Sequence, residues 1–399
     1  MKSDTFKSAF IYEGYKCLVK PTEVVDLNTG YINKKIVIKN NDSANFRAAY
    51  IYGEGLKEIK KHKGSAKNNI LGEFLGIEKN DINSIMSFFE KYGFLFNLNC
   101  YEQYVTFDLE DIMYLKDNLE ALINLLNAQG VQHINYKKFL DSVLFLLLKE
   151  DREIKINDQL VYQSVDNYFL HNIKNATKTN LNTMGNIVHL EKDDGGKDIA
   201  HRCNDSILTD GYYDIIINEY DAFLEDDSTH TQFPKQILKS YVIKKSLFKE
   251  EEELAIEFLF HFMKEISVID LNLLSIDMPF EEEVYSKIDS VENKFLLNAL
   301  IIISKYLIER ELNYHLAEIR PVYNVETMQP NWQVPSLLSA MYLSLFYLDS
   351  RQASYRACQN MNCRQFFLVS KTNSIKKYCC TDCTNAVSQR TYRSKNREQ

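Results

Sequence analysis

Four cysteines near the C-terminus are the residues whose types and spacing suggest the clearest chemistry. They form two pairs, Cys358 with Cys363 and Cys379 with Cys383, and 15 residues lie between the pairs. Each pair brings two thiols together, and the segment between them is long enough for a hairpin that folds both pairs onto one tetrahedral ion. The spacing therefore predicts a site for one structural zinc ion. A module with so few apolar residues would take much of its folding free energy from the metal.

Cys380 leaves a second interpretation open for the third ligand. Cys380 and Cys383 are separated by two residues, which makes a tighter pair than Cys379 and Cys383. We favour Cys379 because of the register described below, and we expect Cys380 to be a spare thiol that could replace it. A redox pair is the alternative to zinc, but two further cysteines at matching distance favour the metal.

The elements around these cysteines can be placed from the pattern of residues. Phe366–Val369 is typical of a strand, 370–374 of a turn and Ile375–Tyr378 of a return strand. Asp382 could then cap a helix that begins at about Cys383. A last ligand in the first turn of a helix gives a treble-clef-like arrangement, in which the ion joins the hairpin to the helix.

Positive charge is concentrated in the same region. Residues 351–399 hold ten Lys and Arg and two acidic residues, a net charge of +8, whereas the whole chain has a formal charge of −8. The first 350 residues therefore hold 37 basic and 53 acidic residues, a net charge of −16. An acidic body with a basic tail indicates that only the tail suits a polyanion. A module that is basic merely for solubility is the alternative.

The predicted final helix would present amides and guanidinium groups on one face, because they recur at intervals of three and four residues. Such side chains suit phosphates and base edges alike. Docking to a protein and simple capping of the module are the alternatives. The residues predicted to contact nucleic acid are Lys376, Lys377, Asn385, Gln389, Arg390, Tyr392, Arg393 and Arg397.

The segment from Tyr355 to Arg393 resembles the CGNR-type zinc finger at the C-terminus of bacterial proteins described as stress-induced transcription regulators. The register Tyr-Cys-x-x-x-Cys at 378–383 follows that pattern, and the helix before it, Leu337–Leu348, resembles the helix preceding the finger. The Cys-Gly-Asn-Arg of the family corresponds here to Cys383, Thr384, Asn385 and Ala386, so its glycine and arginine are both replaced. The resemblance covers roughly 60 of 399 residues, at 335–397, and implies a zinc-dependent DNA-binding protein.

The rest of the chain predicts an α+β fold that is predominantly helical, with a β-rich N-terminal segment and a helical C-terminal half. Residues 9–55 alternate as strands do, with a turn at Asn28-Thr29-Gly30. We expect helices that begin at Asn80 or Asp81 and end at Gly93, and that begin at Asp108 and end at Gly130. Further helices are expected at 246–266, 281–318 and 335–352, with breaks at Pro321, Pro330 and Pro335.

These elements suggest four segments. They are a mixed α/β domain at 1–150, an irregular segment at 151–240, a helical domain at 241–354 and the zinc module at 355–399. The length agrees with two to four domains. No signal peptide and no long apolar stretch is evident, so we expect a cytoplasmic protein without a membrane partner.

The leading hypothesis is a bacterial DNA-binding transcription regulator whose acidic body senses a ligand or mediates dimerisation. One short basic helix neutralises few phosphates, so a homodimer is expected. The alternative is an adaptor or a defence-type effector in which zinc is purely structural. Such an effector could be a nuclease that uses acids such as Asp193, Asp194 or Asp210. Because the chain has no Gly-rich phosphate loop and no His-Glu-x-x-His, no catalytic residue is assigned and an enzyme is not favoured.

Overall fold

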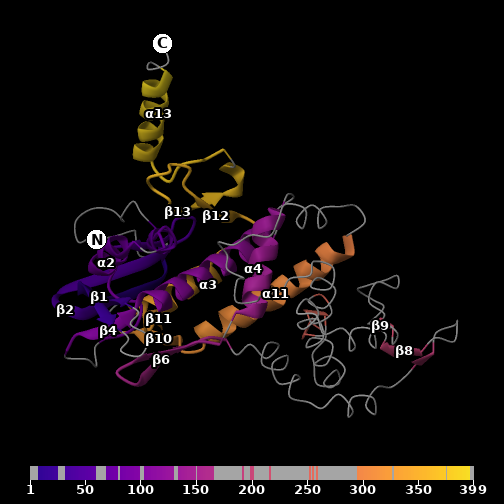
Figure 1. Cartoon of the computed structure of the whole chain (residues 1–399). Helices are drawn as coiled ribbons and strands as arrows, with labels where there is room; N and C mark the ends of the chain where they lie inside the picture. The colour runs from indigo at the N-terminus through magenta and orange to yellow at the C-terminus, as the bar shows by residue number, and fades with distance from the viewer. Residues whose placement is uncertain are drawn as a thin grey trace. The chain divides into compact units, whose positions relative to one another are not determined.

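The computed structural model describes two long parts of the chain. They are residues 8–165, apart from 26–31, 60–68, 80, 99–102, 130–133 and 150, and residues 294–395, apart from 326–327 and 374. Short pieces are described between them, at 191–192, 198–201, 215–216, 251–252, 254–255 and 258. The chain divides into two compact units (Figure 1). Unit 1 is Met1–Val131, Glu153–Gln163 and Glu311–Gln399, and unit 2 is Gln132–Arg152 and Ser164–Arg310.

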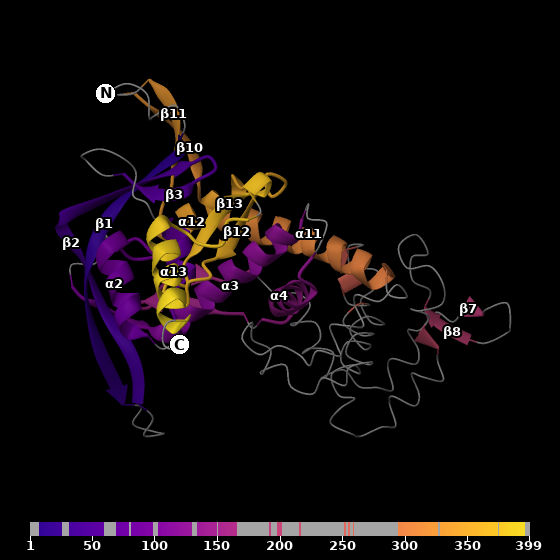
Figure 2. The ribbon, with the colours of Figure 1, turned by 90° about the horizontal axis from the view of Figure 1, so that it is seen from above.

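The α+β class is confirmed, and the β-rich N-terminal segment is a four-stranded antiparallel sheet in unit 1. Its centre is β2 (Ile32–Ile51), which pairs along its length with β1 (Ser8–Val25). The other edge of β2 pairs with β4 (Val105–Asp108) at one end and with β3 (Gly55–Glu58) at the other. Figure 2 shows β1 and β2 as one long, twisted pair of strands.

A bulge in this pair changes which β1 residues face the core. Phe10 and Tyr12 are buried before it, and Cys17 and Val19 after it, so the buried positions switch from even to odd numbers. The shift lies where Tyr15 and Cys17 pair with residues five apart on β2. Because side chains alternate between the faces of a strand, an irregularity of this kind keeps the apolar side chains inside.

Helices cover the buried side of the sheet. They are α1 (Ile70–Leu75), α2 (Ile82–Tyr92), α3 (Leu109–Ala128) and α12 (Leu337–Phe346). The predicted cap is confirmed at Asp81, whose carboxylate accepts from the backbone amides of Asn83 and Ser84. Asp108 also precedes its helix, but its side chain caps no amide and instead lies 2.9 Å from Lys35 Nζ.

Two hairpins of unit 1 were not predicted. The first joins β5 (Glu153–Ile156) to β6 (Gln159–Gln163), and its two turn residues, Asn157 and Asp158, have φ of 47° and 65°. The second joins β10 (Arg320–Asn324) to β11 (Gln329–Gln333), so two of the predicted breaks, Pro321 and Pro330, lie within strands. A two-stranded hairpin tolerates proline because one edge of each strand needs no ladder hydrogen bond.

Unit 2 contains α4 (Tyr136–Leu148), most of α11 (Lys294–Leu316) and the three short strands β7 (Glu191–Lys192), β8 (Asp198–His201) and β9 (Ile215–Ile216). The predicted helix at 281–318 corresponds to α11 from Lys294 onward.

Several predictions lie outside the described residues: the turn at 28–30, Asn80, Gly130, Asp193, Asp194, Asp210, most of the helix at 246–266, residues 281–293 and Arg397. The four predicted segments stay a prediction.

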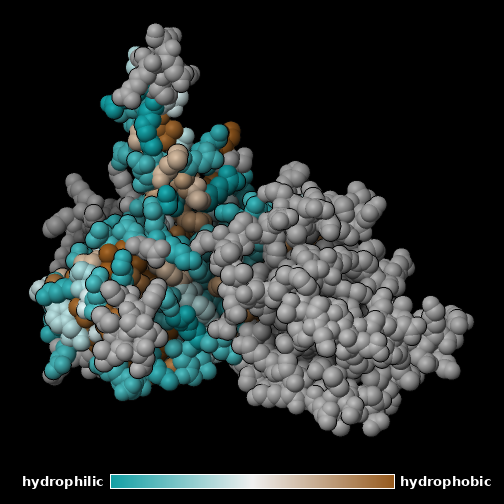
Figure 3. Space-filling view, in the orientation of Figure 1, coloured by the Kyte–Doolittle hydropathy of each residue, from teal (hydrophilic) through white to brown (hydrophobic). Residues whose placement is uncertain are grey.

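The C-terminal module consists of β12 (Ala353–Ala357), β13 (Phe366–Ser370), a 3-10 turn η6 (Lys371–Asn373) and α13 (Thr381–Lys395). Hydrophilic side chains cover most of the described surface in the view of Figure 3. Among the helices in the described ranges, none combines the length and the apolar character needed to cross a membrane.

The N-cap residue of α1, Asn69, and a side chain of α3 hold this module against the rest of unit 1. Asn127 of α3 donates to the carbonyl of Tyr355 at 2.8 Å and accepts from its amide at 3.0 Å, as a neighbouring strand would. The buried Tyr355 hydroxyl accepts from Asn69 Nδ2 at 3.2 Å, and Asn69 Oδ1 caps α1 through the amide of Gly72. The module is therefore docked on the body.

Asn127→Ala should weaken this docking because it leaves the amide and the carbonyl of Tyr355 without their partner. Unsatisfied groups of this kind cost about 1–3 kcal/mol in free energy of unfolding. Urea denaturation and amide exchange at Tyr355 would measure the loss. Asn83→Ala is a matched control, since Asn83 is exposed on α2 and its replacement should change stability by less than about 0.5 kcal/mol. Equal effects of the two changes would contradict the role of Asn127.

Candidate metal centre

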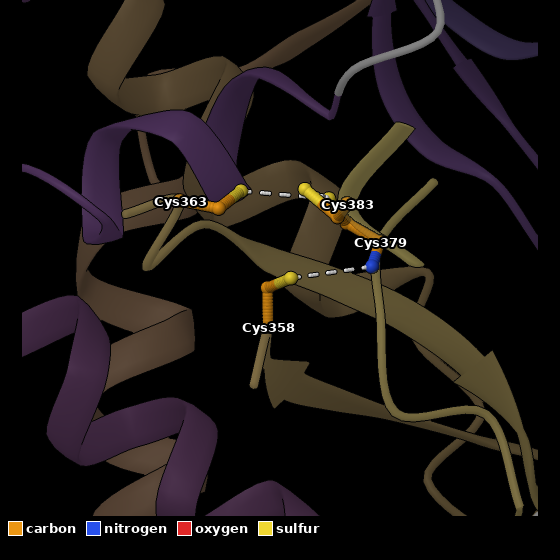
Figure 4. A group of neighbouring side chains, drawn as sticks. All are labelled: Cys358, Cys363, Cys379 and Cys383. Carbon is orange, nitrogen blue, oxygen red and sulfur yellow. Dashed lines mark hydrogen bonds between the residues drawn. The ribbon is translucent and has the colours of Figure 1, made fainter. Parts of the chain in front are cut away.

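The structure brings together the four thiols that the spacing singled out. The ligand atoms of Cys358, Cys363, Cys379 and Cys383 all lie within 4.8 Å of one another, a grouping that could hold a metal ion. Figure 4 shows the side chains turned toward a common point, with Cys363 opposite Cys379 and Cys383. The sulfur of Cys379 lies 3.5 Å from that of Cys363 and 3.5 Å from that of Cys383.

These separations fit a tetrahedral metal site. Four sulfurs that each lie about 2.3 Å from a central zinc ion are about 3.8 Å apart along every edge of the tetrahedron. The observed sulfur separations are close to that edge and far longer than a disulfide bond of about 2.05 Å. The residues present therefore fit a zinc ion in type, number and spacing.

The first ligand pair sits in a tight loop between β12 and β13. The amide of Cys358 donates to the carbonyl of Gln365 at 2.8 Å, and the amide of Cys363 donates to the carbonyl of Asn360 at 2.8 Å. Arg364, directly after the second ligand, has φ of 49°, a left-handed conformation that a non-glycine residue rarely adopts. Its exposed guanidinium lies 3.1 Å from the carboxylate of Glu78.

Two details of the predicted module are wrong. β13 pairs with β12, so residues 375–378 are not a return strand. The strand that pairs with β13 is the segment 353–357, which precedes the first cysteine in the chain. Asp382 is the second residue of α13, which begins at Thr381, so it does not precede the helix. Its negative charge still lies in the first turn, where the helix dipole favours it.

Cys380 lies beside the group but is not part of it. Its sulfur is 3.8 Å from that of Cys379, and its carbonyl accepts from the amide of Thr384 in the first turn of α13. A hydrogen bond from the backbone of Cys383 is the main cause that lowers its pKa. A thiol so close to the group could take the place of Cys379, as the sequence predicted.

Crowding changes the pKa values of the grouped thiols. Burial raises the pKa of Cys379, and the thiols of Cys363 and Cys383 raise it further. Burial also raises the pKa of Cys383, to about 11. Cys358 is the exception: burial opposes its ionisation, yet hydrogen bonds from the backbone of Cys379 and Asn360 lower its pKa. Several thiolates would gather here only beside a cation, which is the electrostatic environment of a metal site.

Asn360 is a buried polar residue beside the thiols that the sequence did not single out. It is 6% exposed, lies between the first two cysteines, and accepts from the guanidinium of Arg390 on α13. It also forms a hydrogen bond that lowers the pKa of Cys383. Partners of this kind orient the ligands of a metal. Two asparagines, Asn360 and Asn362, lie inside this cysteine pair, so the sequence alone could not tell which of them is buried.

The residues predicted to contact nucleic acid lie on the surface where they are described. All of them except Arg397 lie in the described part of the chain, and each of these is exposed: Lys376, Lys377, Asn385, Gln389, Arg390, Tyr392 and Arg393. Tyr392 is 68% exposed, so it does not pack inside the module. Arg390 is exposed as a residue although its guanidinium also binds Asn360.

A shallow cleft of about 730 Å³ lies beside the cysteines. It is lined by 375–382 and Thr384 of the module and by Lys57 of β3. Lys57, Lys376 and Lys377 give it positive charge, and Asp382 is the acidic residue among those that line it. The start of α13 also faces this cleft, so its electrostatic character suits an anion better than a cation.

No protein-family model matches this chain, and neither the curated proteins nor the solved structures include a match to it. The resemblance to the CGNR-type finger therefore stays a prediction carried by the residues of 335–397. The cysteine cluster itself is compatible with a zinc-finger-like module.

Proposed function

We propose that this protein binds nucleic acid, DNA in the first place, through a zinc-stabilised module at 355–399, and that it acts as a transcription regulator. The observation that carries the proposal is the combination of a compact thiol cluster with a helix whose exposed residues, apart from Asp382 in the first turn, are mainly amides, hydroxyls and cations. Zinc would hold β13 and the loop after β12 against the start of α13. That function is structural and leaves the helix surface available for a partner.

The charge distribution supports a polyanion as that partner. The tail carries +8 and the rest of the chain −16, so a nucleic acid would be attracted to the module and repelled by the body. Arg393 and Gln389 lie one turn apart on α13, and Lys377 borders the cleft at its start. On this proposal, Lys377 and Arg393 would bind phosphates and Gln389 would contact base edges.

Replacing Lys377 and Arg393 together with Gln should remove about two phosphate contacts. The slope of log affinity against log salt should become shallower by about 1.8, and affinity for a duplex in 0.1 M salt should fall on the order of 50-fold. Fluorescence anisotropy with a labelled duplex and a labelled single strand across a salt series measures both quantities.

The matched control is Lys20→Gln with Lys34→Gln, which removes the same charge from exposed positions on β1 and β2. It should leave the salt slope unchanged. Zinc-loaded protein without salt-sensitive binding to either probe would reject the proposal and favour an adaptor with a structural metal. If both probes are DNA, tighter binding of the duplex would favour double-stranded over single-stranded DNA as the partner.

A further inference from the structure

A second cleft, of about 580 Å³, lies in unit 1 away from the cysteines. It is formed by residues 96–97, strand β6, the C-terminal end of α11 and the start of α12. Its aromatic side chains come from all four stretches, and amide and hydroxyl side chains lie between them. The residues that define its chemistry are Phe96, Asn97, Tyr162, Tyr314, His315 and Tyr342.

An imidazole stacked between two phenols forms one wall of this cleft. The ring centroids of His315 and Tyr342 are 4.1 Å apart at 25°, and those of His315 and Tyr162 are 5.4 Å apart at 11°. His315 Nε2 lies 3.5 Å from a carboxylate oxygen of Glu311, which is 3% exposed. The pair of Glu311 and His315 therefore has a net charge of zero or −1 and adds no positive charge to the cleft.

The two phenols are the observation that points to a ligand. Tyr162 is 6% exposed and Tyr342 is 1% exposed. Neither hydroxyl forms a hydrogen bond of ordinary geometry with the residues that the structure describes, although the two hydroxyls are near enough for Tyr162 to lower the pKa of Tyr342 against the larger effect of burial. Burial raises the pKa of both, so both stay neutral and keep a proton to donate and lone pairs to accept. A buried hydroxyl without a partner costs about 1–3 kcal/mol, and two that border one cleft are suited to a bound molecule.

The charges around the cleft indicate which molecule. None of the described residues that line it is Lys or Arg, while Glu318 is at its rim and Glu311 lies behind His315. Anions would find no counter-charge there. A cation would meet the carboxylate of Glu318, the faces of aromatic rings and the phenol oxygens.

We propose that this cleft binds a small organic cation, an amine with an apolar or aromatic body. The inference deepens the proposed regulator, because such an amine would be the signal that its acidic body senses. Binding to the cleft is measured without nucleic acid, so this inference and the proposed function can fail separately.

Three probes with nearly the same aromatic body and different charge test the inference: 2-phenylethylamine, 2-phenylethanol and 3-phenylpropanoate. Ligand-observed NMR titration of the full-length protein should show the amine bound about tenfold more tightly than the alcohol, with the carboxylate weakest. Glu318→Gln should lower the affinity for the amine about threefold and leave the affinity for the alcohol unchanged. Equal binding of amine and alcohol, preference for the carboxylate, or no binding of any probe up to millimolar concentration would overturn it.

Tyr342→Phe separates a binding role from a structural one. The variant removes a hydroxyl that costs stability in the free protein, so its melting temperature should be equal to or higher than that of the parent protein. Its affinity for the amine should nevertheless fall about fivefold, because an acceptor is lost. Reduced stability with unchanged amine affinity would show that the hydroxyl serves the fold and would count against the inference.

Discussion

Cys363→Ser should abolish zinc binding and unfold the C-terminal module while the body of unit 1 keeps its structure. Cys363 supplies one of four thiols within 4.8 Å of one another, and a serine hydroxyl is a poor zinc ligand. Structural zinc contributes on the order of 10–16 kcal/mol of apparent binding free energy in small modules. The apolar core beside the thiols cannot replace that amount, since its buried cluster consists of Cys358, Phe367 and Val369, and one of these three is itself a ligand.

Zinc content per chain after dialysis, together with amide exchange in β13 and α13, would measure the effect. We expect one zinc ion in the parent protein and almost none in the variant, with loss of exchange protection confined to the module. Addition of a strong chelator to the parent protein should give the same exchange pattern, because the metal and not the thiol supplies the stability.

The matched control for this experiment is Cys380→Ser, which makes the same chemical change beside the group. Cys380 lies 3.8 Å from Cys379 but outside the four thiols, so zinc content should be unchanged. Zinc retained in Cys363→Ser, or lost in Cys380→Ser, would show that the ligands are assigned wrongly. The double change of Cys379 and Cys380 to Ser should lose the metal even if the single change of Cys379 does not.

The thiol cluster was predictable because metal chelation is encoded locally. Two ligands three to five positions apart in sequence can be brought together by one short loop, so their spacing alone predicts the site. Cys358 and Cys363 lie on such a loop. The capped helix at Asp81 was predictable for the same reason, since a cap and the helix it begins are neighbours in the chain.

Strand pairing and the docking of the module were harder to predict from the sequence, because the contacts that stabilise them join residues far apart in the chain. The partner of β13 is β12, and nothing near residue 366 distinguishes that strand from the expected segment 375–378. Tyr355 is held by Asn127, which is 228 residues away. The aromatic cleft joins Phe96, Tyr162 and Tyr342, which are far apart in sequence, so no local pattern brings them together.

Gly72→Ala should detach the zinc module from the body without removing the metal. Gly72 lies in α1, where alanine is the better helix former by about 1 kcal/mol, so the local preference alone would stabilise the protein. A Cβ atom at this position, however, would overlap the backbone carbonyl oxygen of Phe366 in β13. Neither side of this contact is a flexible side chain that could turn away. The docked arrangement should therefore lose about 3 kcal/mol, the upper end of the usual cost of overpacking.

Zinc content and exchange protection together distinguish detachment from unfolding. In Gly72→Ala the zinc ion should remain, the amides that contact α1 and Asn127 should exchange faster, and those around the cysteines should stay protected. Gly53→Ala is the comparison, because its Cβ would meet no atom within 4 Å and only its φ of 78° opposes the change, at a cost of about 1 kcal/mol. If both alanine variants lost the same stability, backbone strain and not the contact with β13 would explain the need for glycine. If Gly72→Ala also lost its zinc, the metal site would depend on docking, and the module would not be an independent zinc-stabilised unit.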